Sequence, residues 1–259
     1  MNLPVIVEVC IGSLADLEAA RAAGADRVEL CGALELGGLT PSLGLVELAL
    51  AASTLPVVAM VRPRAGGFCY DRAEFQVMLR DAERMIDLGV SGLAFGVLDR
   101  HSRIDASRSR ELVAVAGQAA AVFHRAFDIV ADQQAALEEL VDVGVTRVLS
   151  SGGRPSALEG AGALRRLVEH AQHRMEIMAG GGVTADNVGH ILELTGCRQV
   201  HIGAAAPRDD GAPSAAALEL CDRRCLEGGR YRAVVPQAAA AAARAARVAA
   251  AGAPPADRP

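Results

Sequence analysis

The chain has 259 residues, 51% of them apolar and 22% charged, with a formal net charge of −5. These values are typical of a soluble globular protein that buries a large core. The acidic balance argues against a nucleic-acid or anionic-membrane partner, and the aromatic content of 3%, with no tryptophan, argues against a base-stacking surface. No apolar run reaches the roughly 20 residues that a membrane-spanning helix needs, and the N-terminus lacks the basic segment of a signal peptide. We therefore expect a cytoplasmic protein whose six cysteines stay reduced.

Short apolar segments alternate with longer amphipathic segments along the chain. Strands are predicted at residues 5–10, 27–31, 57–63, 92–98, 120–126, 147–151, 176–181 and 199–203. Helices are predicted between them, at residues 13–23, 43–54, 72–88, 105–117, 133–143, 156–173 and 184–195. Strands separated by helices at this spacing are typical of βα units that form a parallel sheet.

One connection recurs at four places along the chain. A helix ends, a glycine supplies a left-handed turn, and a strand begins two or three residues later, at residues 23–30, 88–95, 143–150 and 195–202. This quasi-symmetry, with the absence of a GxGxxG turn after the first strand, favours a closed (β/α)8 TIM barrel over an open doubly wound sheet. We predict a single α/β domain over residues 1–235 that ends in a closing segment.

The remaining residues, 236–259, are rich in alanine and low in complexity. Alanine has the highest helix propensity, so the first part of this tail is predicted to be helical. Because such tails rarely fold alone, we favour a solvated extension over a helix that packs between subunits. The last eight residues are expected to be disordered.

The motif VExC occurs twice, as VEVC at residues 7–10 and as VELC at residues 28–31. Because side chains alternate along a strand, Glu8 shares one face with Cys10, and Glu29 shares one face with Cys31. The opposite faces are apolar and suit packing under helices, so both polar faces are expected to point into the barrel at its ligand end. Each cysteine taken alone is typical of a small buried hydrophobe. Together the two thiols can hold one soft ion, which suits Cu(I) better than Zn(II).

Buried carboxylates need charged or hydrogen-bonding partners. The cationic and imidazole candidates lie at the ends of other strands, and they are Arg62, Arg64, His124, Arg125 and His201. A structural salt-bridge network is one interpretation of this set. The number of charges at one end of the barrel favours the other interpretation, which is a polar pocket that binds a ligand.

A second hypothesis, from a different class, is an enzyme that acts on a small anionic or phosphorylated metabolite. Gly181 and Gly182 follow the seventh strand and precede a helix, at the place where many barrels hold a phosphate. Arg62, Arg64 and these glycines are the candidates for holding the anion. Glu29, His124 and Asp128 are the candidates for moving protons. The alternatives are structural roles: the glycines form a tight turn, and His124 is a histidine that is hydrogen-bonded inside a polar pocket. The chain contains no lysine, which excludes Schiff-base chemistry.

Six segments of the chain carry a resemblance to a known family. They are GADRVELC, GGLTPSLG, RPRAGGFCY, FHRAFD, RVLSSGG and AGGGV. In this order they resemble the CutC family of copper homeostasis proteins, and the resemblance covers residues 5–205. It implies a (β/α)8 barrel, a cytoplasmic location, a homo-oligomer (dimer or tetramer) and Cu(I) held by the cysteines that match Cys10 and Cys31. A copper homeostasis protein is therefore the leading hypothesis, and the enzyme of anionic metabolites is the alternative.

Overall fold

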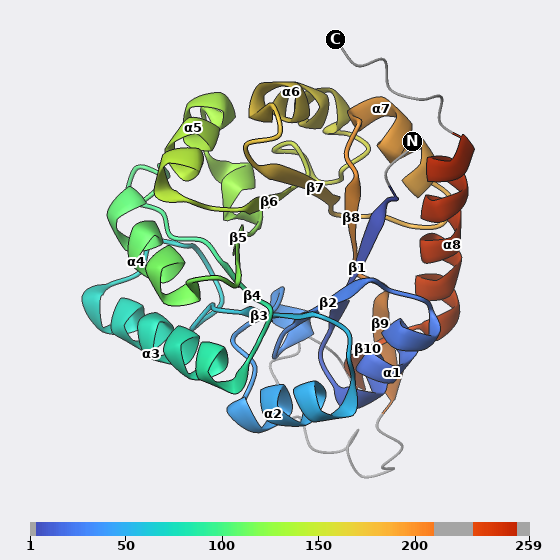
Figure 1. Ribbon diagram of the computed structural model, residues 1–259, viewed down its shortest axis with the longest axis horizontal. Helices are drawn as coiled ribbons and strands as arrows, with labels where there is room; N and C mark the ends of the chain where they lie inside the picture. Colours follow the sequence, from blue (N-terminus) through green and yellow to red (C-terminus); the bar gives the residue numbers. More distant parts are fainter. Residues whose placement is uncertain (1–3, 210–229, 253–259) are drawn as a thin grey trace.

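The computed structural model describes residues 4–209 and 230–252. Eight parallel strands close into a barrel in sequence order, and β1 is hydrogen-bonded to both β2 and β8 (Figure 1). The strands are β1 (Ile6–Ile11), β2 (Arg27–Leu30), β3 (Val57–Met60), β4 (Gly92–Phe95), β5 (Ala120–Phe123), β6 (Arg147–Ser150), β7 (Glu176–Gly180) and β8 (Gln199–Ile202). The predicted TIM barrel is confirmed, and every predicted strand overlaps an observed one.

Helices cover the outside of the barrel after each of the first seven strands. They are α1 (Leu14–Ala22), α2 (Leu43–Ala52), α3 (Arg72–Leu88), α4 (Ala106–Ala116), α5 (Gln133–Val143), α6 (Ala161–Ala171) and α7 (Val188–Thr195). Gly89 and Gly144 end α3 and α5 with φ angles of 97° and 95°, a region that residues with a Cβ atom rarely adopt. The repeated glycine thus reflects a backbone requirement at these turns. Of the helices described, none has both the length and the apolar character that crossing a bilayer requires.

The alanine-rich segment forms an eighth helix, α8 (Pro236–Gly252), which packs between α7 and α1. Its buried alanines lie on one helical face, and they are Ala239, Ala242, Ala243 and Ala246. Arg247 of this helix also forms an ion pair with Asp26. The expectation of a solvated extension is therefore wrong for residues 236–252, because the gap beside β1 and β8 gives this face a surface to cover. Residues 253–259, most of the stretch expected to be disordered, lie outside the described residues.

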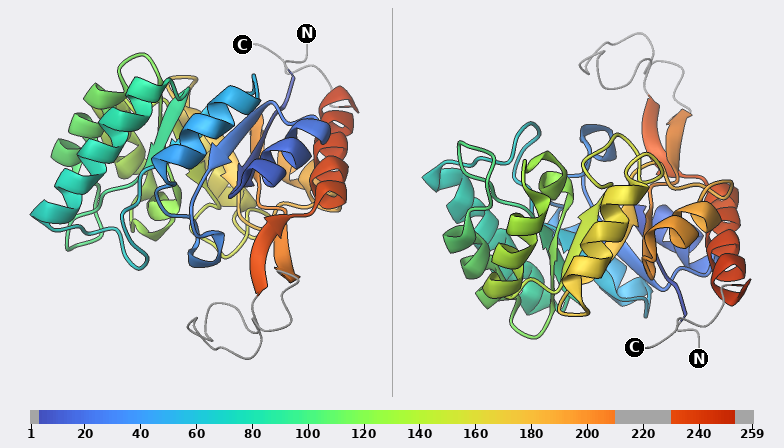
Figure 2. Two further views of the ribbon diagram at one scale, coloured as in Figure 1. Left: turned by 90° about the horizontal axis from the view of Figure 1, so that it is seen from below. Right: turned by 90° about the horizontal axis from the view of Figure 1, so that it is seen from above.

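A two-stranded antiparallel hairpin leaves the barrel between β8 and α8. Its strands are β9 (Ala205–Asp209) and β10 (Arg230–Val234), and β10 forms part of the predicted closing segment. Figure 2 shows the hairpin projecting beyond one end of the barrel. Its base is fixed to the first βα connection, because the buried carboxylate of Asp16 accepts hydrogen bonds from the backbone N–H groups of Val234 at 2.7 Å and Gly12 at 3.0 Å.

The interior of the barrel is divided into an apolar side and a polar side. On the side of β3, β4 and β5, a small apolar cluster contains Val58, Met60, Ala94 and Val122. On the side of β1, β2 and β8, the inward-facing residues are mostly charged or polar, and they are Glu8, Cys10, Arg27, Glu29, Gln199 and His201. The apolar side supplies packing, and the polar side positions the candidate site.

Candidate functional site

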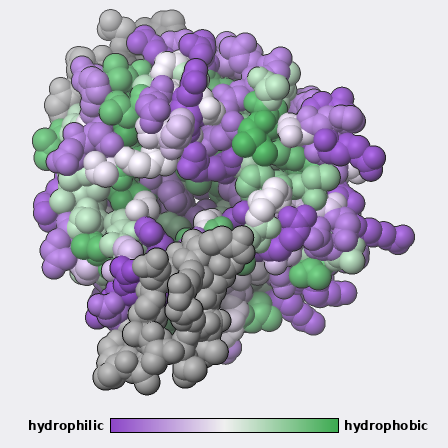
Figure 3. Space-filling model, turned by 180° about the vertical axis from the view of Figure 1, so that it is seen from behind, coloured by the Kyte–Doolittle hydropathy of each residue, from purple (hydrophilic) through white to green (hydrophobic). Residues whose placement is uncertain are grey.

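The candidate site lies where β1, β2 and β8 end inside the barrel. Figure 3 shows the molecule from the face at the carboxyl ends of the strands, where hydrophilic and hydrophobic residues are mixed around the centre. The strand register sets the neighbours, because Glu8 lies beside Arg27 on β2 and beside His201 on β8. Cys10 lies beside Glu29. Five of the residues predicted from the sequence are therefore brought together here, namely Glu8, Cys10, Glu29, Cys31 and His201.

Glu8 is held by two cationic groups. Its Oε2 atom lies 2.5 Å from Nε of Arg27, and its Oε1 atom lies 2.8 Å from Nδ1 of His201. Burial opposes ionisation, but the hydrogen bond and charge of His201 and the charge of Arg27 outweigh it and lower the pKa of Glu8 to about 2. Arg27 is fixed in turn by Gln199, whose Oε1 atom accepts a hydrogen bond from Nη2 at 2.9 Å. Glu8 is therefore ionised at neutral pH.

The two thiols lie next to each other. The Sγ atoms of Cys10 and Cys31 are 3.9 Å apart, and Sγ of Cys31 lies 3.6 Å from Oε2 of Glu29. The side-chain hydrogen bond between Cys10 and Cys31, with a further one between Cys10 and His201, outweighs the penalty of burial and lowers the pKa of Cys10 to about 5. The hydrogen bond between Cys31 and Cys10, together with burial, raises the pKa of Cys31 well above its usual range. The pair therefore carries one thiolate at neutral pH, centred on Cys10.

Glu29 behaves differently from Glu8. Its side chain is 3% exposed, and its Oε1 atom has no hydrogen-bond partner among the described residues. Burial raises the pKa of Glu29 to about 8, against the lowering effect of the charge on His201, whose Nε2 atom is 3.9 Å from Oε2. Glu29 is thus a neutral carboxylic acid over most of the physiological range.

Two overlapping groups of donor atoms result from this packing. One contains Cys10, Glu29 and Cys31, and the other contains Glu8, Glu29 and His201, with the ligand atoms of each group within 4.8 Å of one another. Burial disfavours a charged imidazole, but the interactions of His201 with the side chains of Glu29, Cys10 and Glu8 outweigh it and raise the pKa of His201 well above its usual range. The site combines soft sulfur donors with an imidazole and a carboxyl oxygen.

Arg62 and Arg64 lie on the loop after β3, and their guanidinium groups bind to neighbouring loops and to the start of α3. Nη1 of Arg62 donates to the carbonyl oxygens of Leu36 and Gly38, both at 3.1 Å, and Nη2 donates to Gly66 at 3.0 Å. Arg64 forms an ion pair with Glu74 at the start of α3. These contacts stabilise the loops, and none of them is with a residue of the cysteine site. Anion binding by them stays a prediction.

His124 lies at the end of β5 and is buried. Its Nδ1 atom accepts a hydrogen bond from the backbone N–H of Ala126 at 3.2 Å, and Nε2 has no partner in the described part of the chain. Burial, followed by the positive charge of Arg62, lowers the pKa of His124 to about 3. The ring stacks at a tilt on Phe68, with centroids 5.0 Å apart. His124 is therefore neutral at physiological pH, and because Nδ1 accepts a hydrogen bond, Nε2 carries the ring proton.

Asp128 lies in the short helix η2 (Arg125–Ile129) and joins the loops after β5 and β6. Its carboxylate accepts hydrogen bonds from Ser150 Oγ at 2.6 Å, Ser151 Oγ at 2.9 Å and the backbone N–H of Gly153 at 3.1 Å, and it pairs with Arg125 at 2.7 Å. So many donors make Asp128 a structural junction between the loops. Its predicted role in moving protons has no contact in the structure that supports it.

The two glycines predicted to hold an anion lie against the same loops. A Cβ atom on Gly181 would lie 3.2 Å from the guanidinium carbon of Arg125, and one on Gly182 would lie 3.3 Å from Cβ of Ser156. Both glycines have positive φ angles, 102° and 66°. They allow the loop after β7 to approach the loop after β6, and an additional role in anion binding stays a prediction.

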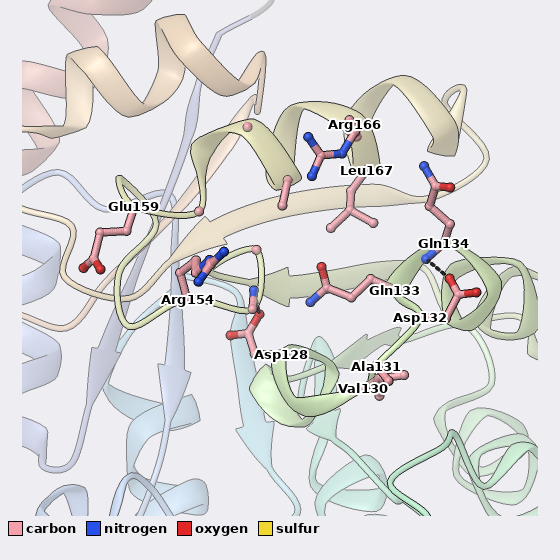
Figure 4. Close-up of a pocket in the computed structure, with 15 residues that line it drawn as sticks. Asp128, Val130, Ala131, Asp132, Gln133, Gln134, Arg154, Glu159, Arg166 and Leu167 are labelled. Carbon is pink, nitrogen blue, oxygen red and sulfur yellow. Dashed lines mark hydrogen bonds between the residues drawn. The ribbon is translucent and has the colours of Figure 1, made fainter.

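A surface pocket of about 870 Å³ lies beside Asp128, between the first turns of α5 and α6 (Figure 4). Asp128, Arg154 and Gln133 point toward it, and Arg166 and Leu167 contribute from α6. The cysteines and their neighbours do not line this pocket. Its charged residues are of both signs, and they are Asp128, Asp132, Arg154, Glu159 and Arg166.

Arg27 and Gln199 also belong to the site, although neither was predicted from the sequence. Arg27 opens β2, two residues before Glu29, and Gln199 lies two residues before His201 on β8. The period-two alternation that placed the glutamates inside the barrel also places these two residues there. Extending that pattern one step toward the amino ends of the strands is the signal that could have found them.

Known proteins match this chain along the barrel. The CutC family pattern matches residues 5–206. A family protein CutC from Treponema denticola is 46% identical over 209 residues, which cover 81% of this chain and 85% of that protein. A human protein described as copper homeostasis protein cutC homolog is 42% identical over 206 residues, covering 80% of this chain and 76% of that one.

Solved structures give the same result at the level of the fold. The crystal structure of a copper homeostasis protein CutC from Streptococcus agalactiae superposes with a TM-score of 0.73 at 37% identity, and it covers 76% of this chain and 97% of that one. A phosphoribosylanthranilate isomerase from Pyrococcus furiosus superposes with a TM-score of 0.54 at 15% identity, covering 94% of this chain and 99% of that one, which shows only a shared barrel fold.

Proposed function

The chain belongs to the CutC family, and we propose that it acts in copper homeostasis by binding Cu(I) through Cys10 and Cys31. The observation that carries this proposal is the distance of 3.9 Å between the two sulfur atoms at the ligand end of the barrel. The thiols come from adjacent strands of a rigid sheet, so their separation is set by the backbone and needs no large rearrangement.

The chemistry of the donors supports a soft ion. At metal–sulfur distances of roughly 2.3 Å, as in zinc thiolate sites, two sulfurs 3.9 Å apart can both reach one ion. Thiolates select Cu(I) over hard cations, and Cys10 is already a thiolate at neutral pH because its pKa is about 5. Cys10 is partly exposed, so an ion can reach it from solvent, whereas Cys31 is buried.

Anaerobic titration with Cu(I) in competition with a chromogenic chelator tests this proposal. Changing a residue that only supports a metal ligand costs up to about 100-fold in metal affinity. The double variant Cys10→Ser/Cys31→Ser removes both ligands, so its affinity for Cu(I) is expected to fall by more than about 100-fold. Cys69→Ser removes an exposed loop thiol and serves as the control, with unchanged affinity expected. Copper binding by the double variant that equals wild type would overturn the proposal.

A second candidate function is proton transfer on a small anionic metabolite. The observation that favours it is the pair of glutamates, one ionised and one protonated, at the mouth of a single barrel, because opposite pKa shifts are typical of acid–base sites. Thermal-shift screening of phosphorylated and carboxylated metabolites tests it. Stabilisation that Glu29→Gln abolishes would support this function, and no stabilisation by any such compound would count against it.

We also propose that the protein works in the cytoplasm as a dimer or tetramer. A reducing compartment keeps both thiols available for copper. Helix α2 presents Leu43 and Leu48 to solvent, 42% and 56% exposed, which is an apolar face suited to a contact between copies. Light scattering on Leu48→Gln tests the oligomer. A dissociated variant would support α2 as the contact, and a monomeric wild type would overturn the oligomer itself.

A further inference from the structure

Glu29 is the member of the cysteine site whose burial the other members do not explain. Its side chain is 3% exposed, and its Oε1 atom has no hydrogen-bond partner within the part of the chain that the structure describes. Glu8 is held by Arg27 at 2.5 Å, whereas the contact of Glu29 with Nε2 of His201 is 3.9 Å long. A buried carboxyl group without close partners is costly, so we expect this one to serve a guest.

Glu29 also shares a small space with both thiols. The donor atoms of Cys10, Glu29 and Cys31 all lie within 4.8 Å of one another. Sγ of Cys31 lies 3.6 Å from Oε2 of Glu29 and 3.9 Å from Sγ of Cys10. The barrel sets these positions, since Cys10 of β1 lies beside Glu29 of β2 in the strand register. Two sulfur donors and one oxygen donor are therefore close enough together to hold one ion.

The two distances are those expected between ligands of a single tetrahedral ion. At a metal–sulfur bond length of about 2.3 Å, sulfurs 3.9 Å apart would subtend an angle of about 116° at the ion. With a metal–oxygen bond of about 2.1 Å, a tetrahedral angle places sulfur and oxygen about 3.6 Å apart, as Cys31 and Glu29 are. Two ligands on opposite sides of an ion would need sulfurs about 4.6 Å apart. The bent arrangement leaves room for a third ligand.

The chemistry of the donors decides which ion gains from Glu29. Cu(I) is soft and gains little from a carboxylate oxygen, whereas Zn(II) is bound by cysteine sulfur and by glutamate oxygen alike. Ligands bind a metal in their deprotonated forms, so two thiolates and a carboxylate bring three negative charges to this buried place. A divalent ion cancels more of that charge than a monovalent ion does. Both arguments favour Zn(II).

We propose that the cysteine site also binds Zn(II), with Cys10, Cys31 and Glu29 as three ligands and a water molecule as the fourth. The inference rests on the proposed function, because it takes the two cysteines as metal ligands, and it adds a second ion and a third ligand. The partly exposed Cys10 marks the side from which the water reaches the ion. Cu(I) uses the two thiols alone, and Zn(II) uses the thiols together with Glu29.

Anaerobic titration with Zn(II), in competition with a chromogenic zinc chelator, tests the proposal. Wild type is expected to bind one Zn(II) tightly, and Glu29→Gln is expected to bind it at least about 100-fold more weakly, because a ligand is lost. The affinity of Glu29→Gln for Cu(I) is expected to stay at the wild-type value. The matched control is Glu193→Gln, which changes an exposed glutamate of α7 and should alter neither affinity.

X-ray absorption at the zinc edge identifies the ligands directly. The zinc-loaded wild type is expected to show two sulfur neighbours at about 2.3 Å and oxygen neighbours at about 2.0–2.2 Å. Four sulfur neighbours would overturn the three-ligand site. Circular dichroism melting checks that each variant folds. Where Glu29→Gln melts early, Glu29→Leu carries the test, because an apolar side chain of similar size suits a buried place.

The outcomes separate this inference from the function on which it rests. Zn(II) binding by Glu29→Gln as tight as that of wild type would overturn the role of Glu29. Wild type that binds Cu(I) but not Zn(II) would overturn the zinc site and leave the copper function standing. A Cys10→Ser/Cys31→Ser variant that loses Zn(II) but binds Cu(I) like wild type would overturn the copper function and leave the zinc site standing.

Discussion

The two copies of the VExC motif have nearly the same sequence and opposite chemistry. In the first copy, Glu8 is ionised with a pKa of about 2, and Cys10 is a thiolate with a pKa of about 5. In the second copy, Glu29 is a neutral acid with a pKa of about 8, and Cys31 keeps its proton. The comparison teaches that the charge of a buried group is decided by its neighbours across the sheet and not by the motif that contains it.

The cause is a stagger of two residues between the strands. If the two VExC motifs were aligned residue by residue across the sheet, Glu8 and Glu29 would be neighbours. The observed register instead sets Glu8 beside Arg27 and Cys10 beside Glu29. The first glutamate therefore gains an arginine and a histidine as partners, and the second faces thiols that offer it little compensation for burial.

Removing Arg27 should have the largest effect on the contrast between Glu8 and Glu29. Arg27→Ala leaves the buried carboxylate of Glu8 with His201 as its remaining partner, and loss of one partner of a buried ion pair costs about 3–5 kcal/mol of unfolding free energy. Urea unfolding at pH 7 measures it. Arg21→Ala, which breaks an exposed pair with Glu18, is the control and should cost under about 1 kcal/mol. Equal costs for the two variants would show that Glu8 does not depend on Arg27.

Titration should then separate the glutamates by pH. Because folding raises the pKa of Glu29 from 4.5 to about 8, the stability from its protonated form is fully present below pH 4.5 and is lost as pH rises to about 8. Across that window the loss reaches at most about 1.4 kcal/mol per pH unit. The difference in unfolding free energy between wild type and Glu29→Gln isolates this contribution from that of His201. A difference that stays constant from pH 5 to pH 8 would contradict the raised pKa.

The smallest expected effect concerns the thiols. Cys10 is partly exposed and ionised, whereas Cys31 is buried and protonated, so iodoacetamide at pH 7 should alkylate Cys10 about tenfold faster or more. Peptide mass analysis over time measures both rates in one sample. Cys31→Ala, which removes the hydrogen-bonding partner of Cys10, should slow the reaction of Cys10 by making it less acidic. Faster alkylation of Cys31 would reverse the assignment of the thiolate.

Much of the architecture could be predicted from local patterns. The barrel followed from alternating apolar and amphipathic segments and from glycines that end helices, such as Gly89 and Gly144, because these signals need only neighbouring residues in the chain. The inward direction of Glu8 and Cys10 followed in the same way from the alternation of side chains along a strand.

Other features depended on surfaces that residues distant in the sequence create. The alanine-rich face of α8 has no strong pattern of its own, and only the gap between α7 and α1 makes it a packed helix. Arg62 and Arg64 carry the same charge as any anion-binding arginine, but loop carbonyls and Glu74 take up their donors. Charge alone could not distinguish these uses.

The sequence by itself determined a (β/α)8 barrel with two glutamates and two cysteines on inward faces of its first two strands, because strand periodicity is a property of the local chain. The tertiary structure alone decided which partner each group meets. Barrel closure places His201 of β8 beside Glu8 of β1, and the stagger of β1 against β2 pairs Glu8 with Arg27. Electrostatic interactions between buried groups depend on separations of a few ångströms, and only the closed and staggered sheet sets those separations.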